Sequence, residues 1–163
     1  MIKQLNFSDL PMAVDVVRAS FATVAEEFGL TEENCPRHTG FAVNLTKLEA
    51  HFHAGALMYG LFDNGQLVGY VALTKTNDSD FNAFSLNNLA VLPEYRHKGY
   101  GKQLLDFCKD RVKELRGGRI EISLNADSTV LKNWYIANGF TLVDKTRLEA
   151  FPFDIGFMIY PIV

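Results

Sequence analysis

The segment Val91–Lys102 combines glycines and basic residues in a pattern suited to binding an anion. It follows an apolar run and precedes residues with helical spacing, so we expect it to join a strand to a helix. Backbone N–H groups in such a turn can point at one anion, and the helix N-terminus adds a partial positive charge. Gly99 and Gly101 allow close approach of the backbone. Full charges come from three side chains of the same segment: Arg96, Lys98 and Lys102. This chemistry fits a diphosphate.

The glycine spacing argues against two common nucleotide-binding loops. A Walker loop needs a glycine that is missing here and a hydroxyl where Gln103 stands. A dinucleotide-binding fingerprint needs a third glycine where Leu104 stands. Two alternatives stay open at this point. One is a nucleotide-binding protein that uses Gly99 and Gly101 differently, and the other is a plain turn with exposed basic residues.

The elements that must position this segment predict an α/β domain. Two apolar runs around Asn64-Gly65 are a strong hairpin signal. One strand–helix–strand unit must place its two strands in parallel. We expect loops over 31–41 and 76–80, helices over 8–28, 46–54, 101–115 and 128–138, and strands over 57–62, 67–73, 84–91, 119–124, 140–143 and 155–162.

Length and composition place the chain among ordinary globular proteins. Its 163 residues suit a single domain over 1–163, with 48% hydrophobic and 21% charged residues. The net charge of −3 and the lack of a basic excess argue against a nucleic-acid partner. The sequence has no run of about 18 apolar residues and no apolar signal-peptide stretch at its start, so we expect a cytoplasmic protein without a membrane partner.

No metal site is expected from the cysteines and histidines. Cys35 and Cys108 form neither a disulfide framework nor a zinc-ligand spacing. His51 and His53 are two residues apart on an expected helix, where their side chains diverge, and no third ligand is evident.

Two motifs resemble those of the GNAT N-acyltransferase superfamily. The stretch Leu89-Ala90-Val91-x-Pro93-x-Tyr95-Arg96-x-x-Gly99-x-Gly101 is similar to motif A of that superfamily. About forty residues further on, Asn133–Phe140 is similar to motif B, a helix with a tyrosine four residues before Gly-Phe. The motifs occur in the family order and spacing, and the layout of elements extends the resemblance over the whole chain. A similar stretch around residues 33–41 occurs in an uncharacterised bacterial branch.

The resemblance implies a GNAT fold. Its central sheet is mixed and mostly antiparallel, is flanked by helices, and has a V-shaped splay between the fourth and fifth core strands. The implied activity is transfer of an acetyl group from acetyl-CoA to a primary amine of a small molecule or peptide, by direct attack through a tetrahedral intermediate. The alternative is a GNAT-fold acyl-CoA-binding module without significant catalysis. Family members often dimerise, and the apolar stretch 155–163 is a candidate interface for a homodimer.

The resemblance also assigns roles to residues of this chain. Tyr135 is the implied general acid for the departing thiolate. A backbone N–H near Ala90 or Val91 is the implied oxyanion donor. Ser128 is either a cofactor contact or a helix N-cap, and both roles are compatible. The implied cofactor-binding residues are Leu89, Ala90 and Val91 for the pantetheine arm, Arg96, His97, Lys98, Gly99, Tyr100, Gly101 and Lys102 for the diphosphate, and Ser128 and Asn133 beside the cofactor.

One departure from the family pattern concerns the general base. Asn87 stands where many relatives carry a glutamate, and asparagine cannot act as a base at ordinary pH. A water chain, Glu121 or His38 are alternatives, and an acceptor amine of low pKa would need no base. Arg37, His38 and Asn87 are candidates for contacting the substrate, although the loop that carries the first two also fits a simple solvated turn. The sequence does not identify the acceptor amine.

Overall fold

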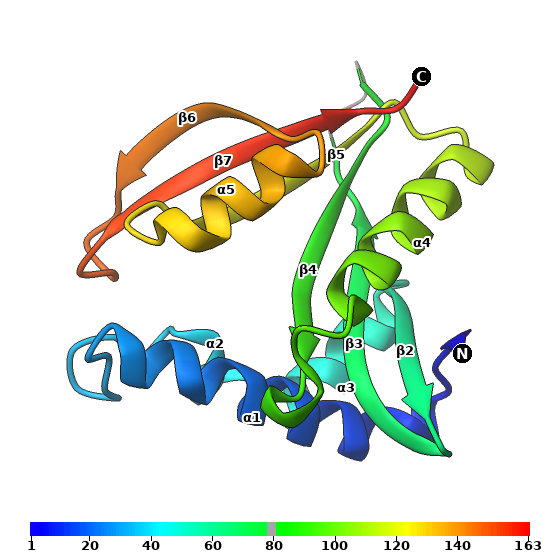
Figure 1. Ribbon diagram of the computed structural model, residues 1–163, viewed down its shortest axis with the longest axis horizontal. Helices are drawn as coiled ribbons and strands as arrows, with labels where there is room; N and C mark the ends of the chain where they lie inside the picture. Colours follow the sequence, from blue (N-terminus) through cyan, green and yellow to red (C-terminus); the bar gives the residue numbers. More distant parts are fainter. Residues whose placement is uncertain (78–80) are drawn as a thin grey trace. The chain divides into compact units, whose positions relative to one another are not determined.

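The computed structural model of the chain describes residues 1–77 and 81–163. Residues 78–80 of the predicted polar loop lie outside the described residues. The elements can be followed in Figure 1 and are β1 (Ile2–Gln4), η1 (Phe7–Asp9), α1 (Leu10–Glu27), α2 (Thr39–Ala42), α3 (Leu45–His53), β2 (Leu57–Asp63), β3 (Gln66–Lys75), β4 (Ala83–Val91), η2 (Pro93–Tyr95), α4 (Tyr100–Glu114), β5 (Arg119–Asn125), α5 (Thr129–Ala137), β6 (Thr141–Arg147) and β7 (Asp154–Pro161).

The strands form one sheet in the order β1-β2-β3-β4-β5-β7-β6. Neighbouring strands are antiparallel, except that β4 and β5 are parallel. The parallel register runs from Ala83↔Arg119 to Ser85↔Glu121. The predicted mixed, mostly antiparallel α/β fold is therefore confirmed.

The chain divides into two compact units. The first unit contains Met1–Thr74 and Leu86–Cys108, and the second contains Lys75–Ser85 and Lys109–Val163. Strand β4 and helix α4 each contribute residues to both units. The expectation of a single domain over residues 1–163 stays a prediction.

In the first unit, helices cover the two faces of strands β2 and β3. On one face, Tyr70 and Met58 join a buried apolar cluster with residues of α1 and α3, such as Val17 and Leu48. On the other face, Tyr59 packs edge-on against Phe107 of α4, with ring centroids 4.8 Å apart. The alternation of the two faces along β2 and β3 follows from the period-two geometry of strands.

In the second unit, α5 covers one face of the antiparallel strands β5, β7 and β6. Phe140 connects the helix to the sheet, because its ring packs edge-on against Tyr135 at 5.3 Å and also lies 5.4 Å from Tyr160 of β7. Ile120 and Met158 are fully buried on the same face of the strands. Strand β6 lies at the edge of the sheet and has a register shift between Leu142 and Asp144.

The structure differs from the sequence predictions at three places. Strand β1 was not predicted, and it pairs with β2 from Ile2↔Leu61 to Gln4↔Tyr59. The predicted loop over 31–41 contains the start of α2, whose N-cap is His38. Strand β6 continues beyond the predicted end at Val143 because it pairs with β7 as far as Arg147↔Asp154. Among the helices of the described residues, none has the length and apolar character needed to span a bilayer.

Tyr70 provides a test of the first core. Its hydroxyl is buried and has no hydrogen-bond partner among the described residues, and burial raises the pKa of Tyr70. We expect Tyr70→Phe to leave the free energy of unfolding unchanged or to raise it by about 1 kcal/mol, because a buried hydroxyl without a partner costs its desolvation energy. Thermal unfolding measures the change.

Tyr100→Phe is the matched control. The Tyr100 hydroxyl donates to Asp63 Oδ2 at 2.7 Å, so the same substitution there removes a formed hydrogen bond and should lower the melting temperature. A clear loss of stability in Tyr70→Phe would show that its hydroxyl makes a favourable interaction in the folded protein.

Candidate functional site

The segment between β4 and α4 has the backbone geometry of an anion-binding turn. His97 and Gly99 adopt positive φ angles of +63° and +81°. Gln103 donates its backbone N–H to the carbonyl of Gly99 at 3.0 Å. The N–H groups of the first helical residues, 100–102, precede this bond and have no acceptor within the helix. The segment therefore presents consecutive N–H groups at the positive end of a 15-residue helix.

Arg96 fixes this segment to helix α1. Its guanidinium donates to Thr23 Oγ1 at 2.9 Å, to the Ser20 carbonyl at 2.8 Å and to Ser20 Oγ at 3.3 Å. The side chain is partly buried at this contact. The sequence analysis treated Arg96 as one of the charges near the diphosphate. In the structure its donors bind the protein itself, so Arg96 positions the segment.

Two tyrosines attach the same segment to the β2–β3 hairpin. Tyr100 donates to Asp63 Oδ2 at 2.7 Å, and Tyr95 donates to Gln66 Oε1 at 3.3 Å. The hydrogen bond to Asp63 raises the pKa of Tyr100, so its hydroxyl remains a donor over a wide pH range. With Arg96, these contacts hold the segment on both sides of residues 97–99.

The remaining basic side chains of the segment face solvent. His97 and Lys98 are exposed, and the Lys98 ammonium lies 5.1 Å from the centroid of the Tyr95 ring. Lys102 pairs with Asp106 one helical turn further on, at 2.5 Å. Because both members of this pair are exposed, it holds Lys102 only weakly. Lys98 and Lys102 therefore give the segment a positive surface, and His97 adds an exposed imidazole beside them.

Strand β4 contains a bulge directly before the predicted pantetheine-binding residues. Asn88 has a φ angle of +56°. Thr76 N donates to Ala83 O at 2.9 Å, and Leu92 N donates to Val68 O at 2.9 Å. Between these two bonds, β4 (from Ala83 to Leu92) is one residue longer than β3 (from Val68 to Thr76). The extra residue in β4 forms the bulge. The sequence analysis missed this bulge, although asparagine is a residue that tolerates this conformation.

The residues on either side of the bulge have different environments. Asn87 donates from Nδ2 to Thr74 Oγ1 at 2.9 Å, so its amide is engaged with β3. After the bulge, Ala90 is buried, whereas Leu89 and Val91 are half-buried. Asn87 and the three residues Leu89–Val91 thus lie on one strand, as the sequence predicted.

Helix α5 of the second unit carries the predicted general acid. Tyr135 is 6% exposed, and its ring packs edge-on between Trp134 and Phe140 at 5.0 and 5.3 Å. Ser128 is the N-cap of the helix, because its hydroxyl accepts from Leu131 N at 3.4 Å. This confirms the capping role predicted for Ser128. Asn133 is exposed on the same helix.

The loop residues Arg37 and His38 differ in their surroundings. Arg37 is exposed, whereas His38 is 8% exposed and packs between the rings of Phe21 and Phe41. The Nδ1 atom of His38 accepts from Gly40 N at 3.2 Å. Burial lowers the pKa of His38, so the neutral imidazole is favoured. His38 therefore stabilises the start of α2, and a role for either residue in reading the substrate stays a prediction.

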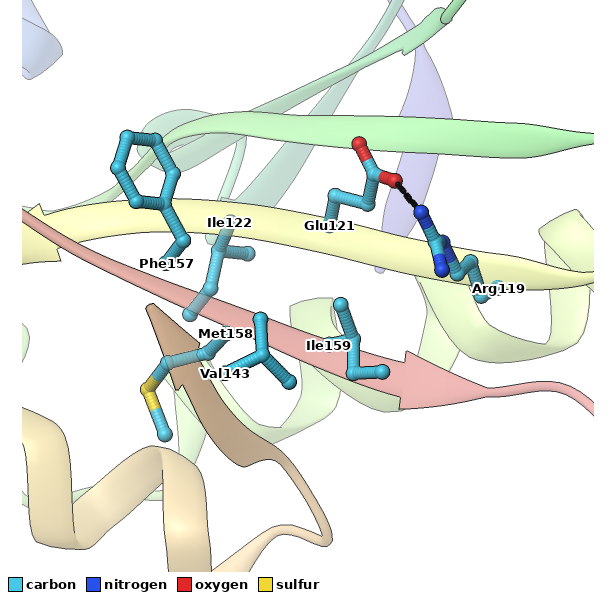
Figure 2. A pocket seen from close by; sticks show the side chains of 7 residues that line it. All are labelled: Arg119, Glu121, Ile122, Val143, Phe157, Met158 and Ile159. Carbon is cyan, nitrogen blue, oxygen red and sulfur yellow. Dashed lines mark hydrogen bonds and ion pairs between the residues drawn. The ribbon is translucent and has the colours of Figure 1, made fainter. Parts of the chain in front are cut away.

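The second unit also contains a pocket of about 260 Å³ on strands β5, β7 and β6 (Figure 2). Its polar lining residues are Arg119 and Glu121, and its apolar lining includes Val143, Phe157 and Ile159. Glu121 Oε1 accepts two hydrogen bonds from Arg119, at 2.9 Å from Nε and 2.6 Å from Nη2. The sequence analysis named Glu121 as one alternative for the base, but it did not anticipate the pocket.

Histidines and carboxylates do not gather into a metal centre in the described part of the chain. Within residues 1–77 and 81–163, no group of three histidine, cysteine, aspartate or glutamate side chains is placed to hold an ion. His51 and His53 lie in the last turn of α3, and both are exposed.

The chain is similar to N-acetyltransferases in sequence and in fold. It is 24% identical over 147 residues to an uncharacterised N-acetyltransferase from the pepI 3′ region of Lactobacillus delbrueckii subsp. lactis, with 86% of this chain and 83% of that protein covered. An uncharacterised Staphylococcus aureus N-acetyltransferase is 34% identical over 98 residues, or 56% of this chain, and this chain covers 62% of its length.

Solved structures of low sequence identity share the fold. The PaiA N-acetyltransferase of Thermoplasma acidophilum, crystallised with coenzyme A, gives a TM-score of 0.80 at 22% identity, with 99% of this chain and 98% of that chain covered. The ribosomal-protein-S18-alanine N-acetyltransferase of Escherichia coli gives a TM-score of 0.79 at 20% identity, with 99% and 93% covered.

A family model for an acetyltransferase (GNAT) domain matches residues 54–142. The match extends from the strand β2 region to β6 and includes the β4–α4 segment and the Tyr135 helix. It covers more than half of the chain. The chain therefore belongs to the GNAT family of N-acetyltransferases and is an acyltransferase.

Proposed function

We propose that the protein transfers the acetyl group of acetyl-CoA to a primary amine of a small molecule or peptide. The observation that carries the proposal is the segment between β4 and α4. Side chains on both sides of residues 97–99 fix it to α1 and to the β2–β3 hairpin, while its own N–H groups at residues 100–102 are left for a ligand. A rigid row of N–H donors at a helix N-terminus favours a diphosphate.

The residues present fit coenzyme A at both ends of this region. Lys98 and Lys102 supply positive charge for the diphosphate, and His97 lies exposed beside them. Gly99 has a positive φ angle, and open space surrounds the position of a Cβ atom there, so the chain can approach a ligand closely. Next to the segment, the backbone of Leu89–Val91 offers the alternating N–H and C=O groups that the two pantetheine amides need once they leave water.

The chemistry requires a neutral amine, an oxyanion donor and a proton for the thiolate. Acetyl-CoA supplies the activated acyl group. The amine nitrogen bonds to the thioester carbon, the carbon–sulfur bond breaks, and the sulfur takes a proton from the Tyr135 hydroxyl. A backbone N–H near Ala90 or Val91 would stabilise the oxyanion. An alkylamine has a pKa of roughly 10.4, so water or Glu121 must remove a proton before or during attack.

A second candidate is an acyl-CoA-binding module without significant catalysis. The observation in its favour is Asn87, which stands where many family members have a glutamate and which donates its amide to Thr74. Binding of acetyl-CoA without turnover of any amine would favour this reading.

Acetyl-CoA is expected to stabilise the protein against heat. A ligand at about 100 times its Kd adds about 2.7 kcal/mol to the free energy of unfolding. For a chain of this length that raises the melting temperature by roughly 5–10 °C. Thermal unfolding with acetyl-CoA, and with ATP as the control ligand, measures the shift. An equal shift with ATP would favour the nucleotide-binding alternative, and no shift at millimolar acetyl-CoA would contradict the proposal.

The charge-reversal variant Lys98→Glu tests where the diphosphate binds. Lys98 is exposed, so the variant should fold normally while it weakens binding of acetyl-CoA about tenfold or more. Lys47→Glu on α3 makes the same change in net charge and serves as the matched control. Equal affinities of the two variants, measured by calorimetry, would place the diphosphate elsewhere.

Tyr135→Phe tests the general acid. Positioned acids contribute about 10²–10⁴-fold, so we expect kcat to fall at least about 100-fold while the KM for acetyl-CoA changes little. Tyr160→Phe is the control, because Tyr160 also packs against Phe140 but lies on β7. Both kcat and KM are obtained for the two variants from the steady-state rate of CoA release. An unchanged kcat in Tyr135→Phe would assign the proton to another group.

A further inference from the structure

The pocket on the second unit has apolar walls and one hydrogen-bond acceptor. Ile159 and Phe157 of β7 are half-buried, and Val143 of β6 is 54% exposed. In the register of β5 and β7, Glu121 lies opposite Ile159. Residues directly opposite in antiparallel strands share a face, so the carboxylate of Glu121 stands beside this apolar wall.

Arg119 orients Glu121 and engages one of its two oxygens. Both hydrogen bonds from the Arg119 guanidinium end on Oε1 of Glu121, and the guanidinium carbon lies 3.9 Å from the centroid of the Phe81 ring. Figure 2 shows the second carboxylate oxygen pointing away from Arg119. The hydrogen bonds of Glu121 within the described residues do not use this oxygen, Oε2. With respect to residues 1–77 and 81–163, it is available to accept from a ligand.

The position of Glu121 along β5 relates the pocket to the reaction. Glu121 is the last residue of β5 in the parallel register with β4, opposite Ser85. Tyr135 contacts the other face of the same strands through Phe140 and Tyr160, and Tyr160 pairs with Ile120. Within this unit, the proposed acid and the pocket therefore lie on opposite faces of the sheet. Both groups act at one carbonyl carbon, so this arrangement requires the reacting carbon to lie beside Glu121, where the register of β4 and β5 ends.

We propose that this pocket binds the acceptor, and that the acceptor is a small primary amine with an apolar aliphatic or aromatic body. The amine N–H donates to Glu121 Oε2, and the body contacts Phe157, Ile159 and Val143. This inference rests on the proposed acetyl transfer and names the substrate class for it. Glu121 acts here by positioning the nitrogen.

The size and charge of the pocket define the class further. Its volume of about 260 Å³ lies just below the range of about 300–1,000 Å³ that is usual for ligand pockets. Its charged lining residues, Arg119 and Glu121, neutralise each other. The lining offers no second carboxylate that could pair with a further ammonium group of a polyamine, so the pocket favours an amine with one charge.

The test compares three kinds of acceptor by release of CoA from acetyl-CoA. The panel contains phenethylamine and isoamylamine, spermidine, and a short peptide with a free α-amine. The expected result is a kcat/KM for the apolar amines at least tenfold above that for spermidine or the peptide. A preference for spermidine or the peptide, or no turnover of the apolar amines, would overturn the proposal.

Glu121→Gln tests the role of Oε2, the carboxylate oxygen that does not accept from Arg119. The glutamine carbonyl can still accept from Arg119, while its NH2 group replaces the acceptor in the pocket with a donor. We expect the KM for phenethylamine to rise at least tenfold and the KM for acetyl-CoA to stay unchanged. Glu114→Gln is the matched control, because Glu114 also pairs with an arginine, Arg111 at 3.0 Å, but does not line the pocket. Equal KM values for the amine in both variants would contradict the proposal.

Val143→Lys tests the apolar wall of the pocket. Because Val143 is 54% exposed, the substitution leaves the buried core unchanged. Its ammonium should repel the amine and raise the KM for the apolar amines, whereas the exposed Leu148→Lys should not. If Val143→Lys instead changes the molecular mass in solution and affects every amine equally, the face is an interface between copies and the proposal is wrong. The acetyl-CoA melting shift, measured in the unmodified protein and in the same variants, separates the two failures. A normal shift with turnover of spermidine or the peptide but not of the apolar amines overturns only the acceptor proposal, whereas no shift, or a shift without turnover of any amine in the panel, means that the proposed activity itself fails.

Discussion

The contact between the Arg96 guanidinium and helix α1 is the constraint on which the segment between β4 and α4 depends. Backbone N–H groups can bind a diphosphate strongly only if they are ordered and have no partner in the protein. Such a segment cannot be ordered by bonds of its own donors. Here the side chains of Arg96, Tyr95 and Tyr100 bind Ser20, Thr23 and the β2–β3 hairpin instead. Order is thus supplied by side chains, and the N–H groups remain available.

The sequence predicted the local features of this region but not the contacts that fix them. Glycine spacing and the strand-to-helix order placed the segment correctly, because both are local signals. Arg96 binds residues more than seventy positions earlier, a pairing that no local pattern contains. The bulge at Asn88 also has no local sequence signal, since it results from the register between β3 and β4. Asparagine permits that conformation without requiring it.

The same distinction holds in the second unit. The N-cap at Ser128 follows from local chemistry and was predicted. The pocket depends on which residues of β5, β7 and β6 stand opposite one another, and the sequence does not fix those registers. His38 shows the limit of residue type as a signal: its place in a loop suggested substrate contact, which stays a prediction, while the structure shows a buried imidazole that caps α2. Residue type alone does not distinguish a capping histidine from a functional one.

The two outer strands of the sheet also determine how the protein behaves at high concentration. Strand β1 has three residues, and β6 combines its register shift with the charged residues Asp144, Lys145 and Arg147. Short, charged or bulged outer strands make poor templates for a strand from another molecule. The backbone groups at these edges are therefore protected against intermolecular β-pairing. Association of two copies would have to use side-chain surfaces, and its strength would depend on shape and apolar area rather than on continuation of the sheet.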